Sequence, residues 1–329
     1  MKNYNEYFLL VMLSSLLYSS VNEVEVSSDA AAAIKLQHDG QKQTFISSQS
    51  KAKAGKDSNN DRSGEPGIGQ RSTSFETGHA ESNNDLSWAY TDTFKTYSAA
   101  KWENYYPICN GSNQSPIPLQ TESSKFSNKS VDSLKFNSTY PEGMIHGILI
   151  NDGHSFGLQV DETRTALRLT GGPLLNQSYQ LHQFHFHFSC DNKGTGSEHS
   201  MDGLKYTAEL HLVFYNLKYC TFKDAVDKPD GLTVMAFFIK SANEINRGVF
   251  FINRYLIDIF TPGSSISIPH GLSIYDLLKK FRDGFENLSY VYYKGSLTTP
   301  PCYESVTWIV FQDPIKVPLR DVSIVNIQL

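Results

Sequence analysis

The sequence is poor in charge and in cysteine, and it has no apolar run long enough to span a bilayer. Its 29 Lys and Arg and 34 Asp and Glu leave a net charge of −5 without a dense basic stretch, which argues against a nucleic-acid partner. Four cysteines are too few for a disulfide scaffold but suffice for one or two bridges. The chain is instead 40% hydrophobic, with 18 Tyr and 20 Phe, which favours a sizeable, β-rich core.

The first 20 residues have the pattern of a secretory signal peptide. An apolar run from Phe8 to Leu17 follows Lys2 and is short for a membrane span of about 20 residues. We therefore expect a secreted protein with no transmembrane helix in the mature chain; an uncleaved anchor or a buried strand is the alternative. Residues 21–84 are polar and have little to bury, which predicts a disordered linker.

The ordered domain is predicted over residues 85–329, and its pattern is dominated by strands. Short β-type runs alternate with turn signals, and only residues 242–260 and 274–285 have a helical pattern. We find no internal repeat and no second core. The sequence therefore predicts a mixed but β-dominated single domain with a few surface helices.

Two of the expected strands carry histidine on a polar face. Because side chains alternate along a strand, Gln183, His185 and His187 share one face, and phenylalanines at 184, 186 and 188 share the other. The same alternation places Glu209, His211 and Val213 on one face of the second strand. The loop of residues 189–206 between them fits an antiparallel return.

A buried polar face of this kind is costly unless its groups find partners. Three imidazoles around a tetrahedral zinc with one open position would resolve that cost. Gln183 and Glu209 each precede a histidine by two residues and are placed to accept the free ring N–H of His185 and His211. The alternative is an ordinary surface strand, to which an H-x-H pattern alone would point.

Several segments resemble the signature segments of the α-class carbonic anhydrases, in the family's order from about Trp88 to Val317. They are SWAY, NGSNQSPIPL, NDGHSFGLQV, QFHFHFS, GSEHSMDGLKYTAELHLVFYN, KPDGLTVMAFFIK and YKGSLTTPPCYESVTWIVF. The resemblance implies a large central, mostly antiparallel twisted sheet. It also implies an enzyme that reversibly hydrates CO2 to bicarbonate and a proton through a zinc-bound hydroxide.

The resemblance assigns a role to each of the three strand histidines and to further residues that the alternation of side chains along the strands does not single out. It makes His185, His187 and His211 the Zn²⁺ ligands. Thr298 matches the threonine that orients the hydroxide, Glu198 the carboxylate that accepts the threonine's proton, and His154 the proton shuttle. Without the family, Thr298 would be a turn residue before two prolines, and Glu198 and His154 ordinary loop residues. The residues matched to the CO2 pocket are Val213, Val234, Leu297, Thr299, Val306 and Trp308.

The cysteines and sequons fit an extracellular member of that family. Cys109 and Cys302 stand where such members place a disulfide, whereas four cysteines alone allow three pairings. We expect Cys190 and Cys220 to be free or buried thiols, because they follow strands that run in opposite directions. Possible glycosylation sequons begin at Asn128, Asn137, Asn176 and Asn287.

The chain ends at Leu329, soon after Val317, without the helix and C-terminal strands of the family. We therefore expect a C-terminally truncated domain. The family's missing segment supplies the carbonyl that orients the ligand matching His187, so its loss would leave that ring without its usual partner. An alternative function follows: a catalytically weak or inactive carbonic-anhydrase-like binding or matrix protein.

Overall fold

The structure is a computed structural model, and it describes residues 87–90, 96–123, 133–139, 143–189, 195–284, 288–318 and 321. The predicted signal peptide, the segment 21–84, Cys190, and the sequons at Asn128 and Asn287 lie outside these residues. The expectation of a disordered linker therefore stays a prediction. None of the described helices combines the length and the apolarity that crossing a membrane requires.

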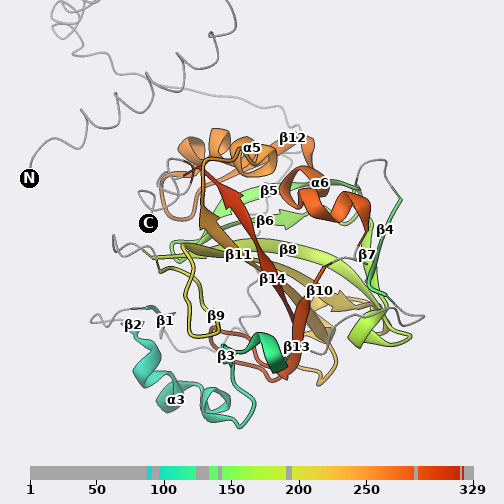
Figure 1. The fold of residues 1–329 in the computed structure, drawn as a ribbon. Helices are drawn as coiled ribbons and strands as arrows, with labels where there is room; N and C mark the ends of the chain where they lie inside the picture. The colour runs from blue at the N-terminus through green and yellow to red at the C-terminus, as the bar shows by residue number, and fades with distance from the viewer. Residues whose placement is uncertain are drawn as a thin grey trace, which may run out of the picture. The chain divides into compact units, whose positions relative to one another are not determined.

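A ten-stranded sheet forms the centre of the domain (Figure 1). Its main path runs β12-β5-β6-β8-β10-β11-β14-β13, and β7 pairs with β8 and with β4. Neighbours on this sheet are antiparallel except β11 and β14. The strands are β4 (Lys135–Ser138), β5 (Met144–Asn151), β6 (Phe156–Val160), β7 (Leu167–Thr170), β8 (Ser178–Phe188), β10 (Ala208–Asn216), β11 (Leu232–Ser241), β12 (Ser265–Ser273), β13 (Tyr290–Gly295) and β14 (Val306–Val317). The expected β-dominated, mostly antiparallel sheet is confirmed.

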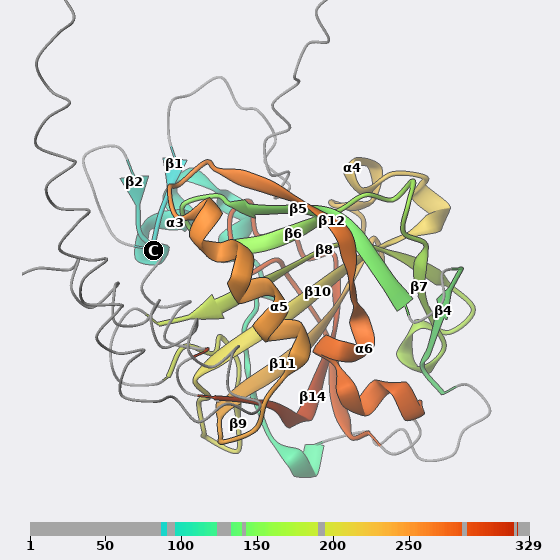
Figure 2. The ribbon, with the colours of Figure 1, turned by 90° about the horizontal axis from the view of Figure 1, so that it is seen from above.

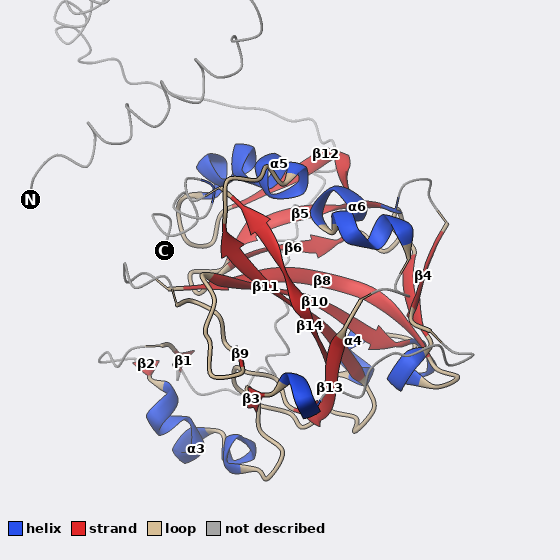
Figure 3. Ribbon diagram, viewed as in Figure 1, coloured by secondary structure: helices blue, strands red, loops and turns tan. Residues whose placement is uncertain are grey.

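Smaller elements precede and interrupt this sheet, and helices are short and peripheral among the described residues (Figure 3). The short strands are β1 (Ser87–Trp88) paired with β2 (Thr96–Tyr97), and β3 (Pro118–Leu119) paired with β9 (Ser200–Met201). The α-helices are α3 (Trp102–Tyr105), α4 (Phe222–Ala225), α5 (Arg247–Leu256) and α6 (Ile274–Leu277). The 3-10 turns are η1 (Ala99–Lys101), η2 (Pro107–Asn110), η3 (Thr121–Ser123), η5 (Gly172–Leu174), η6 (Leu217–Tyr219), η7 (Ile257–Ile259) and η8 (Lys279–Asp283).

Helix α5 shows how a helix is attached to the sheet. It begins where the Asn246 side chain accepts a hydrogen bond from the Val249 backbone N–H at 2.9 Å, which caps the helix. Val249, Ile252 and Leu256 recur at helical spacing and are buried. Figure 2 shows α5 crossing over the central strands, on the same side as α6. The helices α5 and α6 therefore cover this face of the sheet, and apolar side chains fill the space between them and the strands.

The two predicted helical stretches are shorter than the sequence pattern indicates. The first becomes an α-helix only at Arg247, because Asn246 caps it, and continues as the 3-10 turn Ile257–Ile259. The second is interrupted at Leu278, whose φ of −114° and ψ of 66° leave the helical region, and continues as a 3-10 turn.

Strand parity divides the core into two clusters, one on each side of the sheet. Leu210, Leu212 and Phe214 belong to the large cluster that includes α5 and α6. Val213, Val234 and Trp308 belong to the second cluster. The odd-numbered positions of β10, and those of β8 from Gln183 onward, carry the histidines and therefore face the side opposite α5.

Candidate metal centre

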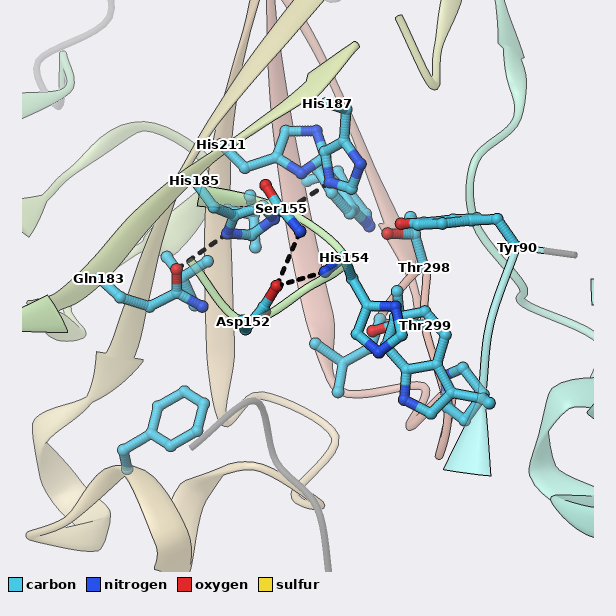
Figure 4. Close-up of a pocket in the computed structure, with 17 residues that line it drawn as sticks. Tyr90, Asp152, His154, Ser155, Gln183, His185, His187, His211, Thr298 and Thr299 are labelled. Atoms are coloured by element: carbon cyan, nitrogen blue, oxygen red, sulfur yellow. Dashed lines mark hydrogen bonds between the residues drawn. The ribbon is translucent and has the colours of Figure 1, made fainter. Parts of the chain in front are cut away.

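The register of β8 and β10 brings the three predicted ligands together. His185 lies opposite His211, and Glu209 lies opposite His187. Paired residues of antiparallel strands share a face, so all three imidazoles project from the same side. Figure 4 shows the rings of His185, His187 and His211 turned toward one another. The strand parity expected from the sequence thus produces a cluster.

Hydrogen bonds to two of the rings determine which nitrogens remain available. His185 Nδ1 lies 2.8 Å from Gln183 Oε1, which can only accept, so this ring donates there and keeps a lone pair on Nε2. His211 Nε2 lies 2.8 Å from the Glu209 carboxylate, so this ring keeps its lone pair on Nδ1. Gln183 and Glu209 therefore hold the contacts that their i−2 positions indicated.

The remaining nitrogens fit a single metal ion. One nitrogen from each of the three rings lies within 4.8 Å of the other two, and the Nε2 atoms of His185 and His187 are 3.1 Å apart. A tetrahedral zinc bound at about 2.0–2.1 Å would separate two ligand nitrogens by about 3.3 Å. Converging lone pairs repel one another unless a cation lies between them. The donor set therefore suits Zn²⁺.

The environment keeps these rings neutral, as metal ligands must be. Burial, and then the neighbouring His211, lower the pKa of His185 to about 3. Burial also holds the pKa of His187 well below its ordinary value, with His211 and His185 adding to the effect. Burial lowers the pKa of His211 as well, although Glu209 opposes it.

Glu198 and Thr298 come from distant loops and form a pair next to the rings. Glu198 is mostly buried, with 14% of its side chain exposed, and it hydrogen-bonds to the Thr298 side chain. Its Oε2 has no hydrogen-bond partner and lies 3.4 Å from His187 Nε2. Burial, and then the Glu209 carboxylate, raise the pKa of Glu198 to about 8, while the Thr298 bond and Lys205 pull it down. A buried, unpartnered carboxylate oxygen of this kind is stabilised by a nearby cation.

Lys205 fixes the loop that carries Glu198. Its ammonium group donates to the backbone carbonyls of Ser197 and Glu198, at 2.9 Å each. The Ser197 hydroxyl adds a bond to the carbonyl of His199 at 2.8 Å. The carboxylate of Glu198 is therefore presented by a loop that is held from both sides.

His154 lies at the mouth of the same pocket and is half-buried. Asp152 Oδ1 accepts the backbone N–H groups of His154 at 2.8 Å and of Ser155 at 2.7 Å, which shapes the turn (Figure 4). The imidazole stacks on Trp88, with ring centroids 4.0 Å apart and planes 17° from parallel. His154 is thus held by Trp88 at a half-buried position in the lining of the pocket.

Apolar side chains line the pocket beside the histidines. Of the predicted pocket residues, the structure places these on its surface: Val213, Val234, Leu297, Thr299 and Trp308. Val306 is fully buried and is not among the residues that line the pocket, so its assignment to the CO2 pocket stays a prediction. Val306 lies two residues before Trp308 on β14 and faces the same side of the sheet. It pairs with Leu232 and packs in the second core cluster together with Val234 and Trp308.

The loop that carries Thr298 is tied to the N-terminal part of the domain. Cys109 and Cys302 form a disulfide across 193 residues of sequence, as the resemblance implied. Cys302 packs in a small cluster with Trp88 and Trp102. Cys220 is free and exposed. The disulfide and the aromatic cluster therefore join the Thr298 loop to the segment on which His154 stacks.

Several residues of the site were not singled out as site residues by the sequence analysis, among them His199, Trp88, Tyr90 and Phe222. His199 is fully buried and contacts Glu209 through Nδ1 at 2.6 Å. Trp88 and Tyr90 line the pocket, as does Phe222. Trp88 stood within a segment that carried the family resemblance, and His199 follows Glu198 directly. Nothing in the local pattern marks Phe222, whose place depends on the fold around α4.

Comparison with known proteins agrees with this fold and site. The family model described as eukaryotic-type carbonic anhydrase matches residues 97–326. Carbonic anhydrase 1 of Monodelphis domestica is 37% identical over 236 residues, which cover 70% of this chain and 82% of that protein. Carbonic anhydrase 3 of Equus caballus is 36% identical over 239 residues, covering 72% and 84%. Carbonic anhydrase 3 of Mus musculus is 39% identical over 221 residues, covering 66% and 78%.

A strand-dominated domain with a histidine cluster on one face of its sheet is thus matched by a class of known enzymes. The chain belongs to the eukaryotic-type carbonic anhydrase family and is an enzyme of that class.

Proposed function

We propose that this chain catalyses the reversible hydration of CO2 to bicarbonate and a proton, with Zn²⁺ held by His185, His187 and His211. The observation that carries the proposal is the convergence of three ring nitrogens, of which two have their other nitrogen occupied by Gln183 and Glu209. Zinc bound there would act as a Lewis acid that lowers the pKa of a bound water. Neutral ligands leave the ion its full charge for this purpose.

Thr298 orients the oxygen that attacks CO2. Because its hydroxyl donates to Glu198, the lone pairs of that hydroxyl are left to accept a hydrogen bond from the pocket side. A fixed acceptor of this kind selects one orientation of the nucleophile, which lowers the entropic part of the barrier. Glu198 acts through Thr298 and is a positioning residue.

His154 carries the product proton from the pocket to solvent. An imidazole can both accept and release a proton, as a shuttle must. The ring lies at the pocket mouth and stacks on Trp88, which supports a role in transfer over a distance. The neighbouring apolar wall of Val213, Val234 and Trp308 gives CO2 a surface without competing hydrogen bonds.

The decisive experiment measures zinc content and CO2 hydration on the purified chain. We expect about one zinc per chain and an activity that chelation removes and zinc restores. His211→Ala is the matched variant, because it deletes one ligand and leaves the other two. Equal hydration rates in the two proteins would refute the proposal. The three neutral histidines and the Glu198–Thr298 pair favour this function over that of an inactive binding protein.

The protein acts outside the cell and carries glycans. The Cys109–Cys302 disulfide supports an oxidising compartment, and the sequons at Asn137 and Asn176 begin at exposed residues. Residues 1–20 serve as the signal peptide in this proposal. Expression in a secretory host tests it: we expect the protein in the medium, cleaved near residue 20 and shortened in mass by a glycosidase. Retention of an uncleaved, unglycosylated chain in the cells would contradict it.

A further inference from the structure

A buried histidine that the proposed reaction does not use lies next to the metal centre. His182 sits where the pairing of β8 with β10 shifts: Val213 pairs with Gln183, but Phe214 pairs with Leu181. His182 is therefore the extra residue of a bulge, and bulges commonly redirect a side chain. The side chain is 10% exposed. Burying a polar ring requires partners, and the structure supplies them.

The His182 ring is held at both nitrogens. Nδ1 lies 2.8 Å from Glu162 Oε1, and Nε2 lies 3.3 Å from Gln159 Nε2. The other Glu162 oxygen accepts the Tyr215 hydroxyl at 2.8 Å. The plane of the imidazole is thus set by contacts from β6, from the turn after β6 and, through Glu162, from β10.

This fixed plane lies flat against Phe222. The ring centroids of His182 and Phe222 are 4.0 Å apart and the planes deviate by 8°. Tyr215 meets the Phe222 ring edge-on, with centroids 6.4 Å apart at 89°. Phe222 is the first residue of α4, 7% exposed, and lines the pocket together with Val213 and Val234. His182 itself does not line the pocket, so it acts through Phe222.

We propose that His182, anchored by Glu162, is a positioning residue that holds Phe222 as a wall of the pocket and thereby limits the size of ligand the site admits. Without the imidazole, the Phe222 ring can move into the space behind it, which widens the pocket on that side. The smallest substrates would be least affected, since they do not fill the space between the walls. This inference rests on the proposed zinc site for its activity readout only.

The activity test compares two ester probes on the zinc-loaded full chain, 4-nitrophenyl acetate and 4-nitrophenyl butyrate. We expect His182→Ala to raise kcat/KM for the butyrate relative to the acetate by about tenfold, the range in which a pocket discriminates added methylenes. Glu162→Ala should shift the ratio in the same direction. Glu162→Gln should keep it, because an amide can still accept from His182 and donate to Tyr215. The control is His270→Ala, an exposed histidine of β12. An unchanged ratio in His182→Ala, which includes an equal fold-change for both esters, would overturn the proposal.

A second measurement decides the same question without any activity. In protein labelled with ¹³C in its phenylalanine rings, we expect slow flipping of the Phe222 ring in the wild-type chain and fast flipping in His182→Ala, with assignment by Phe222→Leu. Equal flipping rates would also overturn the proposal. If the wild-type chain binds no zinc and hydrolyses neither ester, the proposed function fails, and the ring-flip comparison still tests the role of His182. Should His182→Ala not fold, Glu162→Ala serves in both experiments.

Discussion

The carboxylate of Glu209 is bound by His199 twice, through the ring Nδ1 at 2.6 Å and through the backbone N–H at 2.8 Å. Both residues are fully buried. The same carboxylate accepts from His211 at 2.8 Å. Burial raises the pKa of Glu209, but His199 and His211 outweigh it and hold that pKa well below the ordinary value. His199 therefore keeps charged the carboxylate that contacts His211, one of the proposed zinc ligands.

Replacing His199 by Phe should weaken both the fold and the metal centre. The change leaves a buried carboxylate with one fewer donor and should lower the free energy of unfolding by about 2 kcal/mol. It should also reduce zinc affinity roughly tenfold, as loss of an outer partner of a metal ligand does. Urea denaturation and titration against a chelator measure the two effects. His270→Ala is the control, and wild-type values for the His199 variant would contradict the role assigned to it.

Thr298→Ala should lower kcat/KM for CO2 hydration by roughly 100-fold, as removal of one positioned hydrogen-bonding group does. Zinc content should not change, because the three converging ligand nitrogens belong to His185, His187 and His211. Stopped-flow hydration assays and metal analysis check the two statements. Thr298→Ser retains the hydroxyl and should recover most of the activity. A serine variant as slow as the alanine variant would show that the hydroxyl is not what matters.

His154→Ala should slow proton release and spare the conversion of CO2. We therefore expect kcat to fall by up to about 100-fold, with kcat/KM for CO2 close to the wild-type value. Imidazole in the buffer should restore kcat by taking over the transfer. Parallel loss of kcat and kcat/KM, without rescue by imidazole, would place His154 outside the proton pathway.

Removing the disulfide should destabilise the domain. Cys109 and Cys302 close a segment of 193 residues, and loss of a native bridge typically costs about 2–5 kcal/mol. Urea unfolding of the Cys109→Ser/Cys302→Ser double variant should show this loss, and reductant should leave its curve unchanged while shifting that of the wild type. Cys220→Ser is the control, since that thiol is free. Coincident wild-type curves with and without reductant would contradict the prediction.

Asp230 should make stability fall in acid. Burial raises its pKa, but hydrogen bonds from Lys218, Tyr219 and Gln177 outweigh this and hold it at about 2. Because the unfolded carboxyl titrates near 3.8, the unfolded chain binds more protons than the folded chain between these values. The stabilisation is present above about pH 4 and is lost as pH falls toward about 2.

The measurement is the urea midpoint between pH 5 and pH 2. Asp230→Asn should show a lower midpoint at pH 5 and a shallower decline in acid than the wild type. Asp227→Asn is the matched control, because Asp227 pairs with Lys228 at an exposed position. Parallel pH profiles for the wild type and Asp230→Asn would refute this contribution.

Strand parity was enough to predict the half of the site that lies on β8 and β10. His185 and His211, with Gln183 and Glu209, follow a period of two that needs no tertiary information. Glu198, Thr298 and His154 lie on separate loops, and only the tertiary fold brings them to the rings. For these residues the family resemblance supplied what local pattern could not.

The outer strands show where pattern reading fails. β12 has Pro269 in its interior, and its register with β5 shifts between Ile268 and Leu272, so it lacks the regular alternation of a strand. The bulge at His182 does leave a signal in the sequence, because apolar residues stand at odd positions before it (Tyr179 and Leu181) and at even positions after it (Phe184 and Phe186). The alternation was considered only from Gln183 onward, so this change of phase was not used. Phe222 was missed because its distance from the pocket depends on how neighbouring strands and turns pack.

The pairing of His185 with His211 has a consequence for assembly of the enzyme. A slip of one residue between β8 and β10 would turn one set of imidazoles toward α5 and leave no three nitrogens within reach of one ion. If the three histidines bind zinc as proposed, only the correct alignment of His185 with His211, 26 positions later in the chain, brings the ligands together. Metal uptake during refolding is therefore a readout of strand alignment, and added zinc would select correctly aligned chains from those that have mispaired.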